Sequence, residues 1–397
     1  MDRVVRMEDP AGDGQDRFAR FRLINWWDQA RLREAKVLVV GAGALGNEIL
    51  KNLALLGVGR VLVADKDVIE NSNLSRSCLF RESDNGALKA EVAAAAVRTI
   101  FPGVRTHWFR GDVVDGLGLG AYRWADLVIA GLDNRRARLG VNRACWKTGR
   151  PWIDGAIEQL DGIARVFVPP HGSCYECTMS RTDWDILNVE RSCNLLTRDD
   201  MLLGKVPTTP TSASVVAAIQ CQEAVKLLHG LEVLESRAFV FRGLSHDSYV
   251  VSYPRKADCY SHVTYDPVEK LGSSVRGTKV RDLLREVQGR LGRGAVLEFN
   301  QEIVVSLECA GCGRTEAVFR PLSRVSEKEA RCPHCGEERN PALLHGAYGD
   351  EPFLDSTFFE IGIPPFDIIA AREGSAQIYL EFDADAPEVL GPLEEGV

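Results

Sequence analysis

The chain has 397 residues, 45% of them hydrophobic, which is enough for two globular domains of unequal size. Its formal net charge of −8 argues against nonspecific nucleic-acid binding, because such binding depends on clustered Lys and Arg. The sequence lacks both an apolar run of about 18 residues and an N-terminal signal-peptide pattern, so we expect a cytoplasmic protein with neither a membrane nor a nucleic-acid partner.

Residues 1–15 are polar and rich in Asp, Gly and Arg, and we expect them to form a mobile tail. Predicted strands and helices then alternate before a final pair of strands, an order typical of a mixed sheet with helices on both faces. We therefore predict a Rossmann-like α/β domain at 16–265. Its predicted elements are helix 17–32, strand 37–40, helix 48–56, strand 61–64, a helix starting at 87–93, strands 124–129, 152–154 and 162–168, helix 212–228, and strands 238–242 and 248–253.

The stretch 178–209 lacks clear periodicity and is too long for an ordinary connection, so it predicts a functional loop. A charged segment with Gly and Ser at 266–279 marks a domain boundary. Beyond it we predict a smaller α+β domain at 266–385 and a loose acidic tail at 386–397. The elements expected in this second domain are helix 280–291 and strands 296–307 and 377–382.

A strand, a glycine turn and a helix follow one another without a gap at residues 36–56. Gly41, Gly43 and Gly46 give the spacing GxGxxG directly after an apolar strand. The first glycine permits the tight turn, the second lets a phosphate approach the backbone, and the third lets the helix pack on the strand. Free N–H groups at the start of the helix favour a phosphate there. The motif therefore predicts a nucleotide site.

Charged residues fall near the same edge of the predicted sheet. Asp65 ends a strand about 20 residues after Gly46, where a carboxylate binds ribose hydroxyls in such folds; a capping Asp is the alternative. Arg76 suits phosphate recognition, with an ordinary surface position as the alternative. Lys89 places a cation on the first turn of a helix, which a nearby anionic ligand would explain. Asp133 ends another strand and could hold magnesium or cap the following helix.

The eleven cysteines of a cytoplasmic protein need an explanation other than disulfides. Their spacing gives four half-sites of metal-ligand type. These are Cys174 with Cys177, Cys259 with His262, Cys309 with Cys312, and Cys332 with Cys335. The last two form a CxxC-x19-CxxC zinc ribbon at 309–335, with redox dithiols as the alternative. Cys78, Cys145, Cys193 and Cys221 stay unassigned.

Several motifs follow one another through the first domain. They are Arg-aromatic-x-Arg at 17–20, the glycine turn, DxD…SNLxR at 65–76, a lysine at 89, Asp-Asn at 133–134 and QxxEAxK at 220–226. Together they resemble the superfamily of ubiquitin-like-protein activating enzymes and their bacterial sulfur-carrier-activating relatives, the ThiF/MoeB/HesA adenylyltransferases. Ser77 replaces the glutamine that usually ends the SNLxRQ element. The resemblance covers roughly residues 17–265.

The resemblance implies ATP and magnesium as cofactors. The side chains it assigns to them are Asp65 for the ribose, Asn73, Arg76 and Lys89 for the phosphates, and Asp133 for magnesium. Arg20 would reach the nucleotide of a partner subunit, which implies a homodimer. The implied reaction is attack by the C-terminal glycine carboxylate of a ubiquitin-like protein on the α-phosphate of ATP, yielding an acyl-adenylate and pyrophosphate. Cations offset the repulsion between the two anions.

The same resemblance groups the first two half-sites into one structural zinc site. Its ligands would be Cys174, Cys177, Cys259 and His262, with the histidine in place of a cysteine. Cys193 lies where family members carry their catalytic cysteine, and its thiolate could take the acyl group from AMP as a thioester. Arg191 would favour that thiolate. An inert cysteine is the alternative, because some sulfur-carrier activators have one here that adenylation does not require.

Two alternatives come from other classes of protein. A nicotinamide-dependent oxidoreductase would share the glycine turn and Asp65, but it does not account for Arg76, Lys89 and Asp133 together. A noncatalytic scaffold would not need these nucleotide-binding residues.

Within the preferred class, protein conjugation competes with sulfur-carrier activation for cofactor synthesis or tRNA thiolation. Residues 46–57 and 153–155 look closer to the eukaryotic-type conjugation activators. We expect the extra domain at 266–385 to receive a conjugating enzyme, and the short chain would suit a bacterial ubiquitin-like conjugation pathway.

Overall fold

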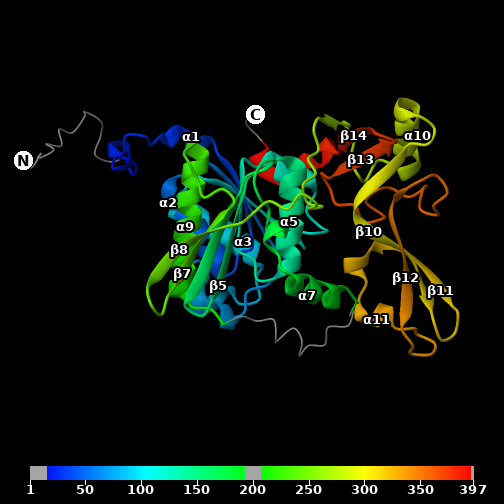
Figure 1. The fold of residues 1–397 in the computed structure, drawn as a ribbon, viewed down its shortest axis with the longest axis horizontal. Helices are drawn as coiled ribbons and strands as arrows, with labels where there is room; N and C mark the ends of the chain where they lie inside the picture. The colour runs from blue at the N-terminus through cyan, green and yellow to red at the C-terminus, as the bar shows by residue number, and fades with distance from the viewer. Residues whose placement is uncertain (1–15, 193–206, 395–397) are drawn as a thin grey trace, which may run out of the picture.

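The structure is a computed structural model that describes residues 16–192 and 207–394. It contains two β-sheets, each with its own helices, and the second sheet lies beside the first domain (Figure 1). The expected mobile tail at residues 1–15 lies outside the described part of the chain.

The first sheet has eight strands in the order β3-β2-β1-β4-β5-β6-β7-β8. Strands β1 to β5 run parallel, whereas β6, β7 and β8 are antiparallel additions. The strands are β1 (Lys36–Val40), β2 (Arg60–Asp65), β3 (Arg105–Arg110), β4 (Leu127–Ala130), β5 (Trp152–Glu158), β6 (Asp161–Phe167), β7 (Arg237–Arg242) and β8 (Asp247–Ser252). The predicted Rossmann-like mixed sheet is confirmed.

Helices cover both faces of this sheet. Helices α2, α3 and α9 share one apolar core with it, and α4 and α5 share another. The helices are α1 (Gln29–Glu34), α2 (Ala44–Leu56), α3 (Lys89–Ile100), α4 (Leu119–Trp124), α5 (Arg135–Thr148), α6 (Tyr175–Thr178), α7 (Arg181–Ser192) and α9 (Pro210–His229). Within the described part of the chain, every helix is too short or too polar to span a bilayer.

Strand β1 shows why the sequence predicted this layering. Val37 and Val39 belong to the core under α2, and Leu38 and Val40 belong to the core on the opposite face. All four side chains are fully buried. A strand that is apolar at every position must be covered on both sides, because successive side chains point to opposite faces.

The second domain has a sheet in the order β11-β10-β13-β14-β9, with β12 also paired to β10. Helix α10 packs on this sheet over a separate apolar core. The elements are β9 (Val268–Lys270), α10 (Val280–Leu291), β10 (Val296–Cys309), β11 (Thr315–Pro321), η4 (Leu322–Arg324), α11 (Glu327–Ala330), β12 (Arg339–Ala347), β13 (Ile368–Glu373) and β14 (Ala376–Glu381). The predicted smaller α+β domain is confirmed.

The second domain docks on both ends of α4. Asp367 accepts a hydrogen bond from the backbone N–H of Leu119 at 2.9 Å. At the other end, Arg123 lies 3.0 Å from the carboxylate of Glu381, which is 1% exposed. Gly120 donates its N–H to the carbonyl of Phe366, and a Cβ at Gly120 would lie 2.5 Å from that oxygen. The contact is therefore close and specific in geometry.

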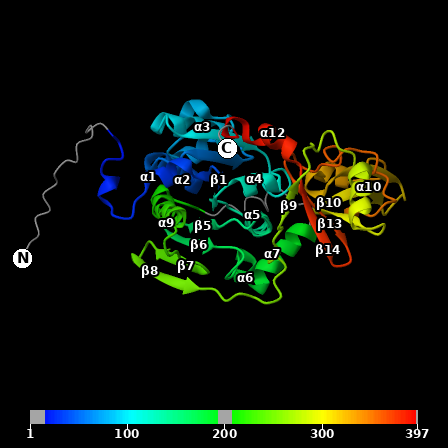
Figure 2. The same ribbon diagram turned by 90° about the horizontal axis from the view of Figure 1, so that it is seen from above.

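The segment expected to be a loose tail at 386–397 is helical over its described part. Helix α12 (Ala386–Leu390) packs against α4 (Figure 2), and η6 (Gly391–Leu393) packs against β3 of the first domain. Leu390 and Leu393 are 2% and 1% exposed and join the core under α4 and α5. The expectation is wrong through residue 394, because two leucines at helical spacing outweigh the acidic composition.

Two other expectations are wrong within the described part of the chain. Helix α7 occupies residues 181–192 of the segment expected to be a loop; Ser180 and Asp183 cap it reciprocally, and Leu187 is buried. The helix expected at 17–32 is interrupted. The chain forms η1 (Phe21–Leu23) and then starts α1 anew, with Asp28 as its N-cap.

Candidate functional site

The glycine turn is shaped by two of its three glycines. Gly41 has φ +91°, and a Cβ there would lie 2.6 Å from the carbonyl oxygen of Gly131. A Cβ at Gly46 would lie 1.9 Å from the carbonyl oxygen of Gly41. Gly43 is the N-cap of α2, and no heavy atom lies within 4 Å of its missing Cβ. The fold therefore requires Gly41 and Gly46, while Gly43 leaves open space at the helix N-terminus.

Asp65 ends β2 beside this turn. Its carboxylate accepts hydrogen bonds from the N–H of Ala42 at 2.7 Å and of Asp67 at 2.8 Å. Burial raises the pKa of Asp65, while these backbone N–H groups and Lys89 act in the opposite direction. The side chain thus ties the glycine turn to β2, and this local role exists whether or not a ribose binds.

Lys89 begins α3 and points back to the loop after β2. Its Nζ lies 3.1 Å from Asp67 Oδ2, and its side chain is 12% exposed, against 52% for Asp67. An ammonium group at a helix N-terminus is unfavourable next to the positive end of the dipole. The adjacent carboxylate offsets part of this cost.

Asn73 and Arg76 lie on the short helix η2 (Asn71–Arg76). Asn73 accepts the backbone N–H of Glu70 at 3.0 Å, which caps η2. Arg76 donates to the carbonyl of Ser72 at 2.7 Å. Both residues therefore make local contacts that fix the shape of this segment.

Asn47 was not predicted as a functional residue, although its side chain connects the glycine turn to the segment after η2. Its side chain is fully buried, its Nδ2 donates to the carbonyls of Ala42 and Gly43, and its Oδ1 accepts the N–H of Leu79. Asn47 thereby joins the glycine turn to the segment that follows Arg76. The sequence signal that could have identified Asn47 is its position as a polar residue among the apolar residues of α2.

Asp133 follows β4, next to the glycine turn. The alternative role of helix N-cap belongs to its neighbour, because Asn134 Oδ1 accepts the N–H of Ala137 at 2.7 Å. The carboxylate of Asp133 is exposed and accepts only the Nδ2 of Asn134 among the contacts described. It is free to serve as a ligand for magnesium.

A buried cluster of Arg138, Asp154 and Arg165 supports the loop that carries Asp133, and it was not predicted from the sequence. Arg138 Nε lies 2.9 Å from Asp154 Oδ1, and its Nη2 donates to the carbonyls of Leu132 and Gly155. Asp154 is fully buried, and Arg165 lies 3.5 Å from its other oxygen. Burial opposes the charge of Arg138, but Asp154 reverses the effect and the pKa of Arg138 is raised.

Arg20, which is expected to reach the nucleotide of a partner subunit, lies away from the nucleotide site of its own chain. Arg20 lies in an exposed turn next to Phe18, which packs against Gly57 at the far end of α2 from the glycine turn. A helix of this length spans about 20 Å. Cys193 lies outside the described residues, and α7 ends at Ser192.

The first metal half-sites come together across two loops. Cys174 Sγ lies 3.5 Å from Cys259 Sγ and 3.7 Å from Cys177 Sγ, which is 3.4 Å from His262 Nε2. Zinc–sulfur bonds of about 2.3 Å place two sulfurs roughly 3.8 Å apart, so this set fits a tetrahedral zinc. Burial and the nearby Arg255 lower the pKa of His262, which favours the neutral imidazole that binds metals.

The second set lies at the far end of β10. The Sγ atoms of Cys309 and Cys335 are 3.3 Å apart, and those of Cys312 and Cys332 are 3.6 Å apart. The four ligand atoms lie within 4.8 Å of one another, as do those of the first set. Both sets fit closed, structural sites without an open coordination position.

Comparison with known proteins places this architecture. The sequence profile of the ThiF family matches residues 15–261. The NEDD8-activating enzyme E1 catalytic subunit of Caenorhabditis elegans is 42% identical over an alignment of 163 residues, and the match covers 37% of this chain and 37% of that protein. The sulfur carrier protein adenylyltransferase of Thermus thermophilus is 36% identical over 208 residues, 51% of this chain and 72% of that protein.

The crystal structure of E. coli MccB with ATP shares the fold. Its TM-score is 0.53 at 20% identity, and the match covers 64% of this chain and 75% of the other. The chain thus spans little more than a third of the nematode subunit it matches, and its second domain lies outside the family match.

Proposed function

The chain belongs to the ThiF family, and from this premise we propose that it is an ATP- and magnesium-dependent enzyme that adenylates the C-terminal glycine of a ubiquitin-like protein. The proposal is carried by the convergence of four segments at one sheet edge. They are the glycine turn after β1, Asp65 at the end of β2, Lys89 at the start of α3 and Asp133 after β4. Cations and a free carboxylate around a phosphate-binding turn suit a nucleoside triphosphate with its metal.

In the proposed reaction, a carboxylate oxygen of the terminal glycine attacks the α-phosphorus of ATP. The bond from that phosphorus to the bridging oxygen breaks, and pyrophosphate leaves. Lys89, together with Arg76 and Asn73 on η2, would hold the triphosphate and offset its charge. Magnesium on Asp133 would neutralise charge on the phosphates.

The test is isotope exchange between pyrophosphate and ATP. We expect exchange with magnesium and a ubiquitin-like protein ending in Gly-Gly, drawn from a panel of such proteins, and none with the same protein lacking its terminal glycine. ATP binding without exchange for any member of the panel would contradict the assigned chemistry. Failure to bind ATP would remove the nucleotide site itself and favour the scaffold alternative. The family match does not favour the oxidoreductase alternative.

The glycine turn offers a matched pair of substitutions. Gly46→Ala is expected to destabilise the protein by about 1–3 kcal/mol, because its Cβ meets the carbonyl of Gly41. Gly43→Ala should cost less than about 1 kcal/mol in stability yet weaken ATP binding about ten- to hundredfold, since its methyl group enters the open space at the helix N-terminus. Urea unfolding and calorimetry measure the two effects. Unchanged ATP affinity of Gly43→Ala would show that phosphate does not approach there.

We further propose that Cys193 accepts the acyl group. Its sulfur would attack the acyl carbon of the adenylate, and AMP would leave. The proposal is supported by its place directly after α7, in the segment between the first zinc half-site and α9. A nonreducing gel with ATP and the carrier should show a reductant-sensitive adduct that Cys193→Ala lacks; an adduct that survives this substitution would move the thioester elsewhere.

Protein conjugation is the role we propose over sulfur-carrier activation, with the second domain receiving a conjugating enzyme. A homodimer in which Arg20 reaches the partner's nucleotide is part of the same proposal, as are the bacterial pathway, the cytoplasmic setting and zinc in both cysteine sets. The exposed position of Arg20 at the far end of α2 supports a role outside its own site.

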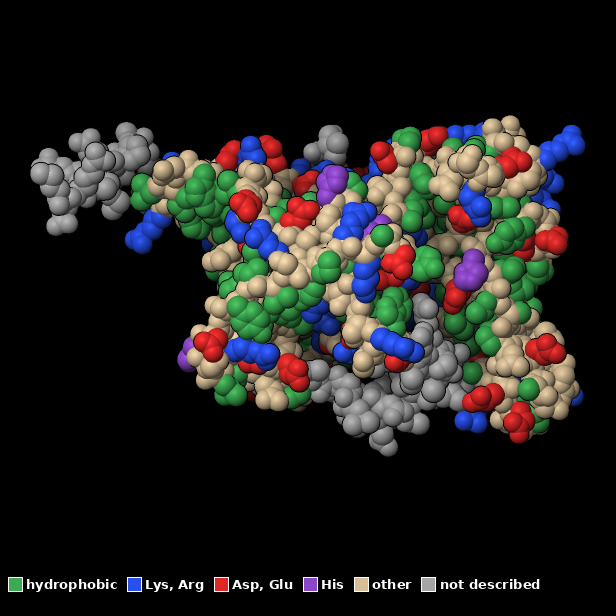
Figure 3. All heavy atoms as spheres, in the orientation of Figure 1, with side chains coloured by type: hydrophobic (Ala, Val, Ile, Leu, Met, Phe, Trp, Pro, Cys, Tyr) green, Lys and Arg blue, Asp and Glu red, His purple; other side chains and the backbone are tan. Residues whose placement is uncertain are grey.

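On the face drawn in Figure 3, basic and acidic side chains are interspersed over both domains.

A further inference from the structure

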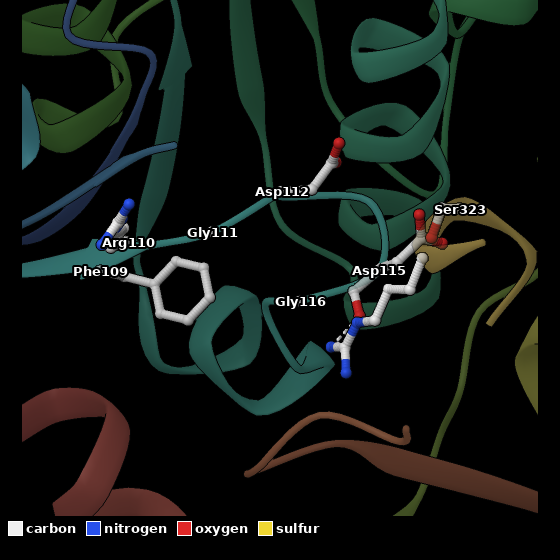
Figure 4. Close-up of a pocket in the computed structure, with 8 residues that line it drawn as sticks. Phe109, Arg110, Gly111, Asp112, Asp115, Gly116 and Ser323 are labelled. Atoms are coloured by element: carbon white, nitrogen blue, oxygen red, sulfur yellow. Dashed lines mark hydrogen bonds between the residues drawn. The ribbon is translucent and has the colours of Figure 1, made fainter. Parts of the chain in front are cut away.

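A cavity of about 360 Å³ lies where the second domain meets the end of β3. Most of its lining comes from the end of β3 and the connection between β3 and α4, and the rest comes from η4 of the second domain. The lining residues are Phe109, Arg110, Gly111, Asp112, Asp115, Gly116, Ser323 and Arg324. Figure 4 shows Ser323 beside Asp115. Ser323 and Arg324 lie outside the segment that matches the ThiF family.

The strand order places this cavity next to the nucleotide site. In the sheet, β3 is the neighbour of β2, and Arg110 pairs in register with Asp65. Strands β4, β1 and β2 are successive neighbours in the sheet. Asp133 follows β4, the glycine turn follows β1, and Asp65 ends β2. A nucleotide with its phosphates at the glycine turn and its ribose at Asp65 would therefore direct its base toward β3. The cavity lies at that end.

The cavity has a flat apolar side and a charged rim. The ring of Phe109 packs beneath the glycines, since a Cβ at Gly111 would lie 2.8 Å from the ring. Arg136 engages the carboxylate of Asp115 at 2.6 Å, and Lys66 lies 3.4 Å from that of Asp112. The acidic groups of the cavity are thus already paired with cations of the first domain.

Arg324 enters this arrangement from the second domain. Its Nη2 lies 3.5 Å from the backbone carbonyl of Asp115, a long contact that holds the guanidinium only weakly. A planar guanidinium stacks on aromatic faces and donates to ring nitrogens and carbonyls. The docking of Asp367 and Glu381 on α4 fixes the second domain beside the same connection.

We propose that the second domain completes the base end of the nucleotide site, with Arg324 contacting the base of the bound nucleotide. The inference rests on the proposed function, because it requires ATP at the glycine turn. It makes Arg324 a determinant of affinity for the base. It also makes nucleotide binding and the position of η4 mutually dependent, since a ligand that contacts both domains stabilises their docked arrangement.

Arg324→Ala tests the proposal. Arg285→Ala is the control, because Arg285 carries the same charge and is exposed on α10 of the same domain. Arg324→Ala should weaken ATP binding about fivefold in calorimetry and raise the KM for ATP in exchange, with kcat unchanged. Its affinity for inorganic tripolyphosphate, which has no base, should equal that of the unsubstituted protein. Arg285→Ala should leave both affinities unchanged.

Three outcomes would overturn the proposal. Equal ATP affinity of Arg324→Ala and the unsubstituted protein would exclude contact with the base. An equal loss for ATP and tripolyphosphate would make Arg324 a general electrostatic contributor. Absence of ATP binding by the unsubstituted protein would remove the proposed function together with this inference, whereas the first two outcomes leave that function intact.

Discussion

Replacing Lys89 with alanine is expected to slow carrier-dependent ATP–pyrophosphate exchange about 10²–10³-fold at saturating ATP. The ammonium group is held beside the loop after β2 by Asp67, with only 12% of the side chain exposed. A positioned cation acts where the phosphates gain charge, so its loss raises the barrier rather than merely weakening binding. The exchange rate is measured at several ATP concentrations to separate kcat from KM.

The free energy of unfolding should change little. The Asp67 side chain of the Lys89–Asp67 pair is half exposed, and such ion pairs contribute at most about 1 kcal/mol to stability. Lys36→Ala is the matched control. This lysine begins β1, at the amino ends of the parallel strands and so away from the nucleotide site, and its removal should leave exchange unchanged. A Lys89→Ala protein that exchanges at the normal rate would place the phosphates elsewhere.

Replacing Arg138 with alanine is expected to destabilise the protein by about 3 kcal/mol. The change leaves Asp154 buried with only the 3.5 Å contact of Arg165, and it deprives the carbonyls of Leu132 and Gly155 of their donor. Urea unfolding measures the effect. Arg165→Ala is the control, because Arg165 reaches the same carboxylate but neither carbonyl, and it should cost less than half as much.

A double-mutant cycle then separates charge from packing. Arg138→Ala combined with Asp154→Ala should destabilise the protein by at least about 1 kcal/mol less than the sum of the two single changes. Strict additivity would mean that the ion pair contributes nothing and that Arg138 acts only through the carbonyls.

The glycine turn and the residues at the strand ends could be predicted because the interactions that shape them are local. A steric rule fixes Gly41 and Gly46, and the end of a buried parallel strand fixes Asp65 beside the turn. The grouping of Cys309, Cys312, Cys332 and Cys335 could be predicted in the same way, from spacing. In contrast, Arg138 and Asp154 lie on different elements, and only the folded sheet brings their charges together.

The segments whose structure was wrongly predicted from the sequence are stabilised by tertiary contacts. Helix α7 has a capping signal at Ser180 and Asp183, but its weak periodicity hid the burial of Leu187. The C-terminal segment looked unstructured because its acidic residues dominate the composition, and its helices are stabilised by a core formed far away in the sequence. The contact of Arg324 with the first domain likewise has no local signal.

The position of α12 and η6 has a consequence for synthesis on the ribosome. Val389, Leu390 and Leu393 complete the core beneath α4 and α5, whereas the core of the second domain is complete once Phe382 is in place. Since the chain emerges from its N-terminus, the N-terminal domain is the last of the two to close its core. Until residues 389–393 have emerged, the apolar surface that receives these leucines stays exposed, so completion of the first domain's core depends on a segment that follows the second domain in the chain.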